Sequence, residues 1–149
     1  EGTPDSHASA MARVLDRADV VAVGVRGVSQ EEVDVSNAHA GSTLIWADEM
    51  MDDDAWMDKA IDALGPKVYL TFDVDYFDPS FVPSTGTPEP GGGDWYRTLR
   101  FLKRVFAERE VVAADVVELA PTPGLNAPDF LVAKLVYKLV SYRYQGRLV

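Results

Sequence analysis

Two aspartates separated by one residue follow an apolar run, and a loop rich in Pro, Gly, Ser and Thr comes next. Asp73 and Asp75 lie in the stretch KVYLTFDVDYFDPSFVPSTGTPEPGGG, which runs from Lys67 to Gly93. Because side chains alternate between the two faces of a β-strand, both carboxylates could point the same way from a strand end while Val74 points toward the core. Two carboxylates held this close repel each other unless a cation lies between them or one takes up a proton. The pair therefore indicates either a metal site or a carboxyl group with a strongly raised pKa.

The loop after the aspartates helps to weigh these alternatives. A D-x-D sequence alone also occurs in enzymes that bind a metal-diphosphate and as ordinary acidic residues of loops. Here Pro and Gly residues between Asp78 and Gly93 stiffen a loop that must return past the strand end, as expected for a loop that shapes a pocket. Hard divalent cations prefer oxygen ligands, so the continuation favours a metal role for Asp73 and Asp75.

Apolar runs of strand length alternate with helical patterns along the chain. The expected strands are Val20–Val25, Thr43–Ala47, Val68–Phe72 and 111–119. Strands rich in Val and Leu that are joined by helices indicate an α/β fold, a three-layer α/β/α arrangement with a parallel sheet to which this chain contributes about four strands. Ligands of such sheets bind beyond the carboxyl ends of the strands, where Asp73 and Glu118 are both expected.

Helix starts are marked by residues that commonly cap helices. Ser6, Ser29 and Asp94 each precede an amphipathic or mixed segment, and a further helix is expected over 128–144. These helices provide the crossovers that a parallel sheet requires.

Composition narrows the classes of partner. The chain has 149 residues, 47% of them hydrophobic, with 14 Lys and Arg against 24 Asp and Glu, a formal charge of -10. One compact domain is expected, and the absence of a basic cluster interleaved with aromatic residues argues against nucleic acid and fits a small cationic ligand better. The chain has no cysteine, no apolar run of membrane-spanning length and no signal-peptide pattern, so the prediction is a cytoplasmic protein without a membrane partner.

Three segments carry a resemblance to a known family. FDVDYFDPSFVPSTGTPEPGG resembles the metal and substrate signature of the ureohydrolases, the arginase and agmatinase family. DVVELAP, residues 115–121, is similar to a later family segment that ends in Glu and Pro, and SHASAMARVLDRADVVAVGVRGVSQEE resembles a bacterial agmatinase-type stretch that begins at a site histidine. The resemblance covers nearly the whole chain. It implies an arginase-like fold and the Mn²⁺-dependent hydrolysis of a guanidino compound to urea and an amine, first of all agmatine to putrescine in polyamine biosynthesis.

The resemblance also implies roles for individual residues. Asp73 would bridge the two Mn²⁺ ions of a binuclear site and take part in catalysis, and Asp75 would bind one of the ions. Thr87 and Glu118 would hold the guanidinium group, and His7 would pass a proton to the leaving amine. The role of Glu118 is also chemically reasonable without the resemblance, because a carboxylate pairs with a planar guanidinium in bidentate fashion. The simpler readings are a surface acid for Glu118, a turn hydroxyl for Thr87 and a helix cap or an exposed side chain for His7.

Other family segments are absent from this sequence. The family completes its metal site with G-G-D-H and D-A-H-x-D segments, and His39 in NAHAG matches neither well enough to be more than a loop residue. The expectation is that 1–149 is the C-terminal portion of a single ureohydrolase domain, inactive without an N-terminal half that carries the remaining ligands. The alternative is a non-catalytic chain that binds a partner or serves a structural role.

The predicted substrate and oligomeric state rest on the family resemblance more than on individual residues. The arginase, guanidinobutyrase and formimidoylglutamase branches stay open beside the agmatinase branch, and family members commonly form trimers or hexamers, so a homo-oligomer is expected. Arg26 is the one evident basic residue near the strand ends. An acidic chain with so few donors favours dicationic agmatine over arginine, whose carboxylate would need them.

Overall fold

The computed structural model describes residues 10–145, in which helices and strands alternate. In chain order the elements are α1 (Ala10–Leu15), β1 (Val20–Val25), α2 (Gln30–Ala38), β2 (Ser42–Trp46), α3 (Glu49–Asp52), α4 (Ala55–Ala63), β3 (Lys67–Asp73), the 3₁₀ turn η2 (Val74–Tyr76), α5 (Trp95–Glu108), β4 (Glu110–Val117) and α6 (Asn126–Tyr144). The four strands and their helical crossovers are those that the sequence predicts.

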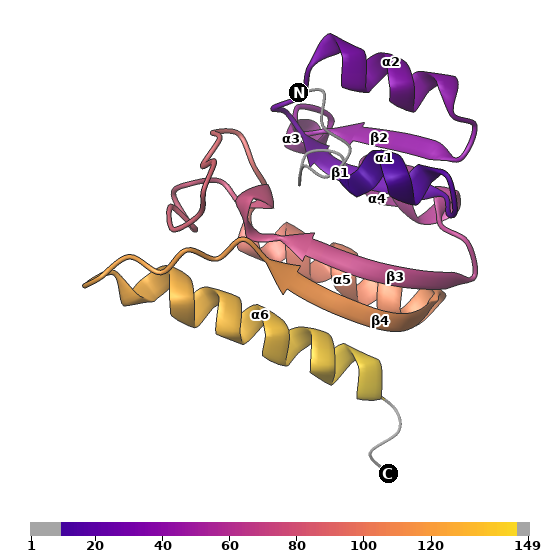
Figure 1. Ribbon diagram of the computed structural model, residues 1–149. Helices are drawn as coiled ribbons and strands as arrows, with labels where there is room; N and C mark the ends of the chain where they lie inside the picture. Colours follow the sequence, from indigo (N-terminus) through magenta and orange to yellow (C-terminus); the bar gives the residue numbers. More distant parts are fainter. Residues whose placement is uncertain (1–9, 146–149) are drawn as a thin grey trace.

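The strands pair in two parallel sets, which Figure 1 shows one above the other. β1 pairs with β2, with Val20 opposite Ser42, and β3 pairs with β4, with Asp73 opposite Val117. The expectation was a parallel sheet to which the chain contributes about four strands, whereas within residues 10–145 no ladder joins the two pairs. Packing of α4 against α5 joins the two pairs, and a side chain of η2 provides a further link to β1.

That link is a close contact between a glycine and an aromatic ring. Gly24 lies at an irregularity of β1, between Val23 and Val25, with a φ of +82° that L side chains rarely adopt. A Cβ at this position would lie 2.7 Å from a ring carbon of Tyr76. Glycine is therefore needed at this position both to adopt the positive φ and to leave room for the ring of Tyr76, which brings the turn after β3 against the end of β1.

Each strand pair has its own core, and a third buried cluster of Ile61, Val105 and Val111 joins α4 to α5 and β4. Ile45 of β2 is fully buried against α4, where Met57 and Ala60 are buried with it. The core of the second pair combines β3, the turn, the loop that follows, α5 and α6, through Phe72, Val74, Phe77, Val82, Leu102, Val132, Leu135 and Leu139. On the other face of β3, Tyr69 and Thr71 are exposed and both donate hydrogen bonds to the carboxylate of Asp115. The alternation along β3 thus directs one set of side chains into the core.

The helix starts expected at Ser29 and Asp94 are confirmed. Ser29 and Glu32 form a reciprocal capping box at α2, and the Asp94 carboxylate accepts hydrogen bonds from the backbone of Tyr96 and Arg97 at the start of α5. These bonds satisfy amide groups that the first helical turn leaves without partners. Over residues 10–145 the helices are too short or too polar to span a bilayer.

Candidate active site

The carboxyl end of β3 places Asp73 and Asp75 beside each other. Asp73 is the last residue of the strand, and its Oδ1 accepts a hydrogen bond from the backbone N–H of Asp75 at 3.0 Å. Val74 between them is fully buried in the core. The expected geometry, with Val74 turned inward below two neighbouring carboxylates, is confirmed. A buried valine anchors the turn, so the two acids cannot easily rotate away from the strand end.

The Pro/Gly loop folds back over this turn, as the sequence predicts. The N–H of Gly93 donates to the carbonyl of Tyr76 at 2.8 Å, and the N–H of Asp78 donates to the carbonyl of Gly93 at 3.2 Å. The hydroxyl of Thr87 donates to Oδ2 of Asp75 at 3.2 Å. The loop that was expected to shape a pocket therefore brings a hydroxyl directly to one of the two aspartates (the loop and turn lie at the ends of the β3 and β4 arrows in Figure 1).

A carboxylate holds the base of the loop together. Asp78 accepts hydrogen bonds from the backbone N–H groups of Ser80 and Gly91, both at 2.9 Å. A hydrogen bond from the Ser80 side chain, followed by these two and one from the Gly92 backbone, lowers the pKa of Asp78 to about 2 because such bonds favour its ionised form. The two ends of the loop are thus joined by a charged group that stays ionised at neutral pH.

Glu118 reaches the same region from β4. It directly follows the strand, is exposed, and has a φ of 66°; no other residue of 10–145 except glycine has a positive φ. A Cβ built on Gly86 would lie 4.0 Å from Oε2 of Glu118, which places this carboxylate next to the residue before Thr87. A left-handed conformation costs a residue with a side chain roughly 1–2 kcal/mol, and such strain is typical of functional sites.

The three acids influence one another. Burial, opposed by the hydrogen bond from the Asp75 N–H and reinforced by the charges of Asp75 and Glu118, raises the pKa of Asp73 to about 6. The ionised form of Asp73 is therefore held in an environment that disfavours negative charge. A bound cation would relieve that cost, so the arrangement suits a metal ion or a cationic ligand.

The fit of this region to Mn²⁺ follows from its donors. Asp73 and Asp75 offer carboxylate oxygens, which hard cations prefer, and their mutual repulsion is what a cation would offset. Among residues 10–145, however, there is no group of three or more His, Cys, Asp and Glu side chains that could hold a metal ion. The described part of the chain thus fits as a fraction of a metal site, with two carboxylate ligands.

Of the two histidines, only His39 lies in the described residues, and it does not add to this set. His7 lies outside the described residues, so its predicted role at the site is neither supported nor contradicted. His39 follows α2 as its C-cap residue, and its Nδ1 accepts a hydrogen bond from the Gly41 N–H at 3.3 Å. The expectation of a loop role for His39 is confirmed.

Arg26 is a residue of this region that sequence reasoning undervalued. It follows β1 directly, and its guanidinium donates to the backbone carbonyls of Asp75 and Glu89. The sequence showed it only as an isolated basic residue after a strand. That position, at the carboxyl end of a parallel strand, is the signal that could have drawn attention to it.

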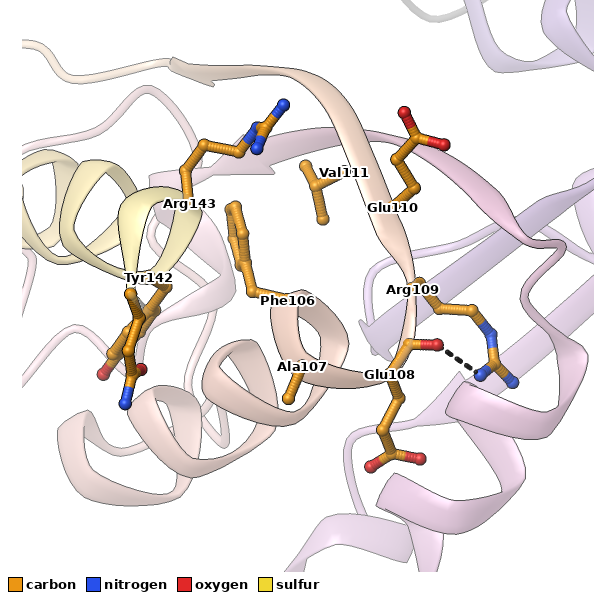
Figure 2. A pocket seen from close by; sticks show the side chains of 9 residues that line it. Phe106, Ala107, Glu108, Arg109, Glu110, Val111, Tyr142 and Arg143 are labelled. Atoms are coloured by element: carbon orange, nitrogen blue, oxygen red, sulfur yellow. Dashed lines mark hydrogen bonds between the residues drawn. The ribbon is translucent and has the colours of Figure 1, made fainter. Parts of the chain in front are cut away.

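A separate pocket lies at the opposite end of the β3–β4 ladder. It has a volume of about 350 Å³ and is lined by residues that include Phe106, Glu110, Tyr142 and Arg143 (Figure 2). Glu110 pairs with Lys67 at the start of the ladder, whereas Asp73 pairs with Val117 at its end. The guanidinium of Arg109 in this pocket donates to main-chain carbonyls, including that of Ile61 at 2.8 Å. This pocket is therefore distinct from the region of the three acids and carries no comparable set of reactive groups.

Comparison with known proteins gives matches over most of the chain. The model of the Arginase family matches residues 1–141. The N(1)-aminopropylagmatine ureohydrolase of Synechocystis sp. is 42% identical over 144 residues, which are 95% of this chain and 47% of that protein. The agmatinase of Pyrococcus horikoshii is 30% identical over 142 residues, 95% of this chain and 49% of that protein. The chain thus spans about half the length of the curated relatives it matches.

The fold is also that of solved family members. The crystal structure of the agmatine ureohydrolase of Thermoplasma volcanium has a TM-score of 0.82 and 27% sequence identity to this chain, covering 99% of it and 52% of the solved chain. Nearly every described element therefore has a counterpart there, and the α/β arrangement predicted from the sequence is confirmed.

Proposed function

Since this chain belongs to the arginase family, we propose that the complete protein hydrolyses a guanidino compound and releases urea and an amine. The observation that carries the proposal is the convergence of Asp73, Asp75, Thr87 and Glu118 at the ends of two neighbouring strands. Three acids and a hydroxyl in one place provide both for a metal ion and for a positively charged substrate.

Asp73 and Asp75 are the proposed metal ligands. Their carboxylates would supply two of the ligands of a binuclear Mn²⁺ site, and the remaining ligands would come from outside residues 10–145. When bound, Mn²⁺ would supply a water molecule of lowered pKa for attack on the guanidinium carbon. The raised pKa of Asp73, about 6, supports this role because it reports a carboxylate that a neighbouring cation would stabilise.

Glu118 and Thr87 are the proposed guanidinium ligands. A carboxylate accepts two parallel N–H bonds from a planar guanidinium, and the exposed side chain of Glu118 has the freedom to do so. The Thr87 hydroxyl, which donates to Asp75, keeps oxygen lone pairs with which to accept a further N–H. Together they would orient the guanidinium carbon next to the metal ligands, which is where positioning lowers the barrier. His7 would pass a proton to the leaving amine nitrogen.

A guanidino-amine without an α-carboxylate is the proposed substrate. Agmatine, which would yield putrescine and urea, and its aminopropyl derivative both fit this description. The formal charge of -10 supports a dicationic substrate, and the names of the relatives from Synechocystis and Pyrococcus horikoshii point to the same class. The same proposal includes a homo-oligomer of three or six chains in the cytoplasm.

Urea release by the complete protein tests this function. With Mn²⁺ present, agmatine or aminopropylagmatine is expected to exceed arginine by at least about tenfold in kcat/KM, or about 1.4 kcal/mol of discrimination. Arginine as the better substrate would place the protein in the arginase branch with the same site residues. Failure to release urea from any guanidino compound would favour the non-catalytic alternative.

A further inference from the structure

Arg26 makes an unusual set of hydrogen bonds for a charged residue at the edge of the candidate site. Its Nη1 donates to the carbonyl of Gly24 at 3.2 Å, and its Nη2 donates to the carbonyl of Asp75 at 2.5 Å. Its Nε and Nη2 both donate to the carbonyl of Glu89, at 3.0 and 2.7 Å. All three nitrogens of the guanidinium are therefore directed to main-chain oxygens of three different segments.

Two of these carbonyls, those of Asp75 and Glu89, belong to the two segments that meet at the candidate site. Asp75 is a proposed metal ligand, and Glu89 is two residues after Thr87, whose hydroxyl donates to the Asp75 carboxylate. One side chain thus fixes both partners of the Thr87–Asp75 contact to the end of β1. The planar guanidinium suits this task because its donors are held in a rigid fork, and bonds from a charged donor are stronger than neutral ones.

The same geometry bears on substrate choice. A residue that reads a substrate carboxylate must present two parallel N–H groups to it. In Arg26 the donors that would form such a fork already bond to Asp75 and Glu89. Arg26 was the one evident basic residue near the strand ends in the sequence. Because its donors already bond to main-chain carbonyls, the obvious group in this part of the chain for binding the carboxylate of arginine is not free to do so.

We propose that Arg26 is a positioning residue: its guanidinium holds the Asp75 turn and the Thr87 loop in register and does not bind substrate. The effect of Arg26 on catalysis rests on the proposed function. The structural part of the proposal, the fixing of the loop to β1, stands apart from any activity. The two parts are tested by separate measurements on the complete protein.

Hydrogen exchange tests whether Arg26 holds the loop. In Arg26→Ala, the amides of Gly91 and Gly93, which donate to Asp78 and to Tyr76, are expected to exchange at least about tenfold faster than in the wild type. Arg104→Ala is the matched control, since Arg104 pairs with Asp58 and Glu108 on helices away from the loop. Unchanged exchange at both glycines would overturn the proposal whatever the activity of the protein.

Kinetics test whether the held loop matters for the reaction. In Arg26→Ala loaded with Mn²⁺, kcat for urea release is expected to fall at least about 30-fold, while the ratio of kcat/KM between agmatine and arginine changes less than about twofold. Arg26→Lys, which keeps the charge but offers a single nitrogen, is expected to lie between the wild type and Arg26→Ala in exchange and in kcat, and replaces Arg26→Ala if that variant does not fold.

The outcomes separate the competing roles. A changed substrate ratio would show that Arg26 binds substrate and would overturn the proposal. Faster exchange with an unchanged kcat would confirm that Arg26 holds the loop and would overturn its consequence for catalysis. A wild-type protein that releases no urea would reject the proposed function, and the exchange measurement would still decide whether Arg26 holds the loop.

Discussion

The carboxyl ends of β3 and β4 bring acids to the same place by different physical means. After β3, the turn is anchored by Val74 and Phe77, which are 0% and 1% exposed, and the loop is closed by backbone hydrogen bonds. After β4, Glu118 is exposed and its backbone is in the left-handed region, with a φ of 66°. Packing positions Asp73 and Asp75, whereas an unfavourable conformation positions Glu118.

This difference predicts how substitutions at the two strand ends affect stability and site geometry. At the β3 end, substitutions disturb stability and site geometry together, because the same buried groups serve both. At the β4 end, the position of the carboxylate costs stability, so the two properties can be separated. Four predictions test this comparison, in order of decreasing expected effect.

The largest effect is expected from removal of either aspartate of the β3 end. Asp73→Ala or Asp75→Ala in the complete protein is expected to reduce bound Mn²⁺ per chain and to lower kcat/KM for urea release at least about 10³-fold, or about 4 kcal/mol. Metal analysis and kinetics on the same samples measure both. Asp62→Ala, at an exposed position of α4, is the control. A full complement of metal in Asp75→Ala would contradict its assignment as a ligand.

The second prediction concerns the close packing of the loop against the β3 turn. A Cβ at Gly92 would lie 2.4 Å from the carbonyl oxygen of Tyr76 and 2.6 Å from the nitrogen of Asp78. Since both are backbone atoms, Gly92→Ala must displace the loop and is expected to lower the free energy of unfolding by about 3 kcal/mol in denaturant titrations. Gly65→Ala, where nothing lies within 4 Å, should change it by less than about 0.5 kcal/mol. Equal effects of the two substitutions would show that the β3 end is not tightly packed.

The third prediction separates stability from activity at the β4 end. Glu118→Gly is expected to raise the free energy of unfolding by about 0.5–1 kcal/mol, because glycine adopts a positive φ without the steric cost, although it gains freedom in the unfolded chain. The same variant should lose urea release. Glu118→Gln, which keeps the strained conformation and removes the charge, should lose activity without the gain in stability. A less stable Glu118→Gly would argue that the left-handed conformation carries no cost here.

The smallest effect is expected from the charge at the base of the loop. The pKa of Asp78 is about 2, below its ordinary value of 3.8, so its ionised form stabilises the fold above about pH 4 and this contribution is lost as the pH falls through 2. Asp78→Asn should therefore lower the free energy of unfolding at pH 7 by about 0.5 kcal/mol, a modest value because solvent screens the group. The difference between variant and wild type should shrink below pH 4. A difference that persists at pH 2 would point to a contribution other than charge.

The two strand ends also differ in how much of them the sequence reveals. At the β3 end, an apolar run followed by Asp73, Val74 and Asp75 predicts a buried valine between two acids, although Asp75 lies in the 3₁₀ turn that follows the strand. The position of Glu118 after β4 follows in the same way. The left-handed backbone of Glu118 could not be predicted in this way, because Gly and Asn are the residues that commonly adopt that conformation and Glu is not.

Contacts between distant segments are the part that local patterns miss. Arg26 bonds to carbonyls 49 and 63 positions away along the chain, and no spacing rule connects them. The packing of Tyr76 against Gly24, which brings the turn after β3 to β1, is equally non-local. Sequence patterns report the elements and their exposed ends, whereas these links arise only when the elements meet.

The β3–β4 ladder has a consequence for the order in which the molecule folds. Lys67 pairs with Glu110 and Asp73 with Val117, so the loop over 78–93 and all of α5 lie between the paired strands. Closing so long a segment loses chain entropy before the ladder offers any compensation, and parallel pairing of this kind forms slowly. Asp73 and Glu118 therefore become neighbours only when the crossover is complete. A refolding chain should gain its helical signal first and its capacity to bind a cation at these acids last, so that cation binding reports the closure of this ladder.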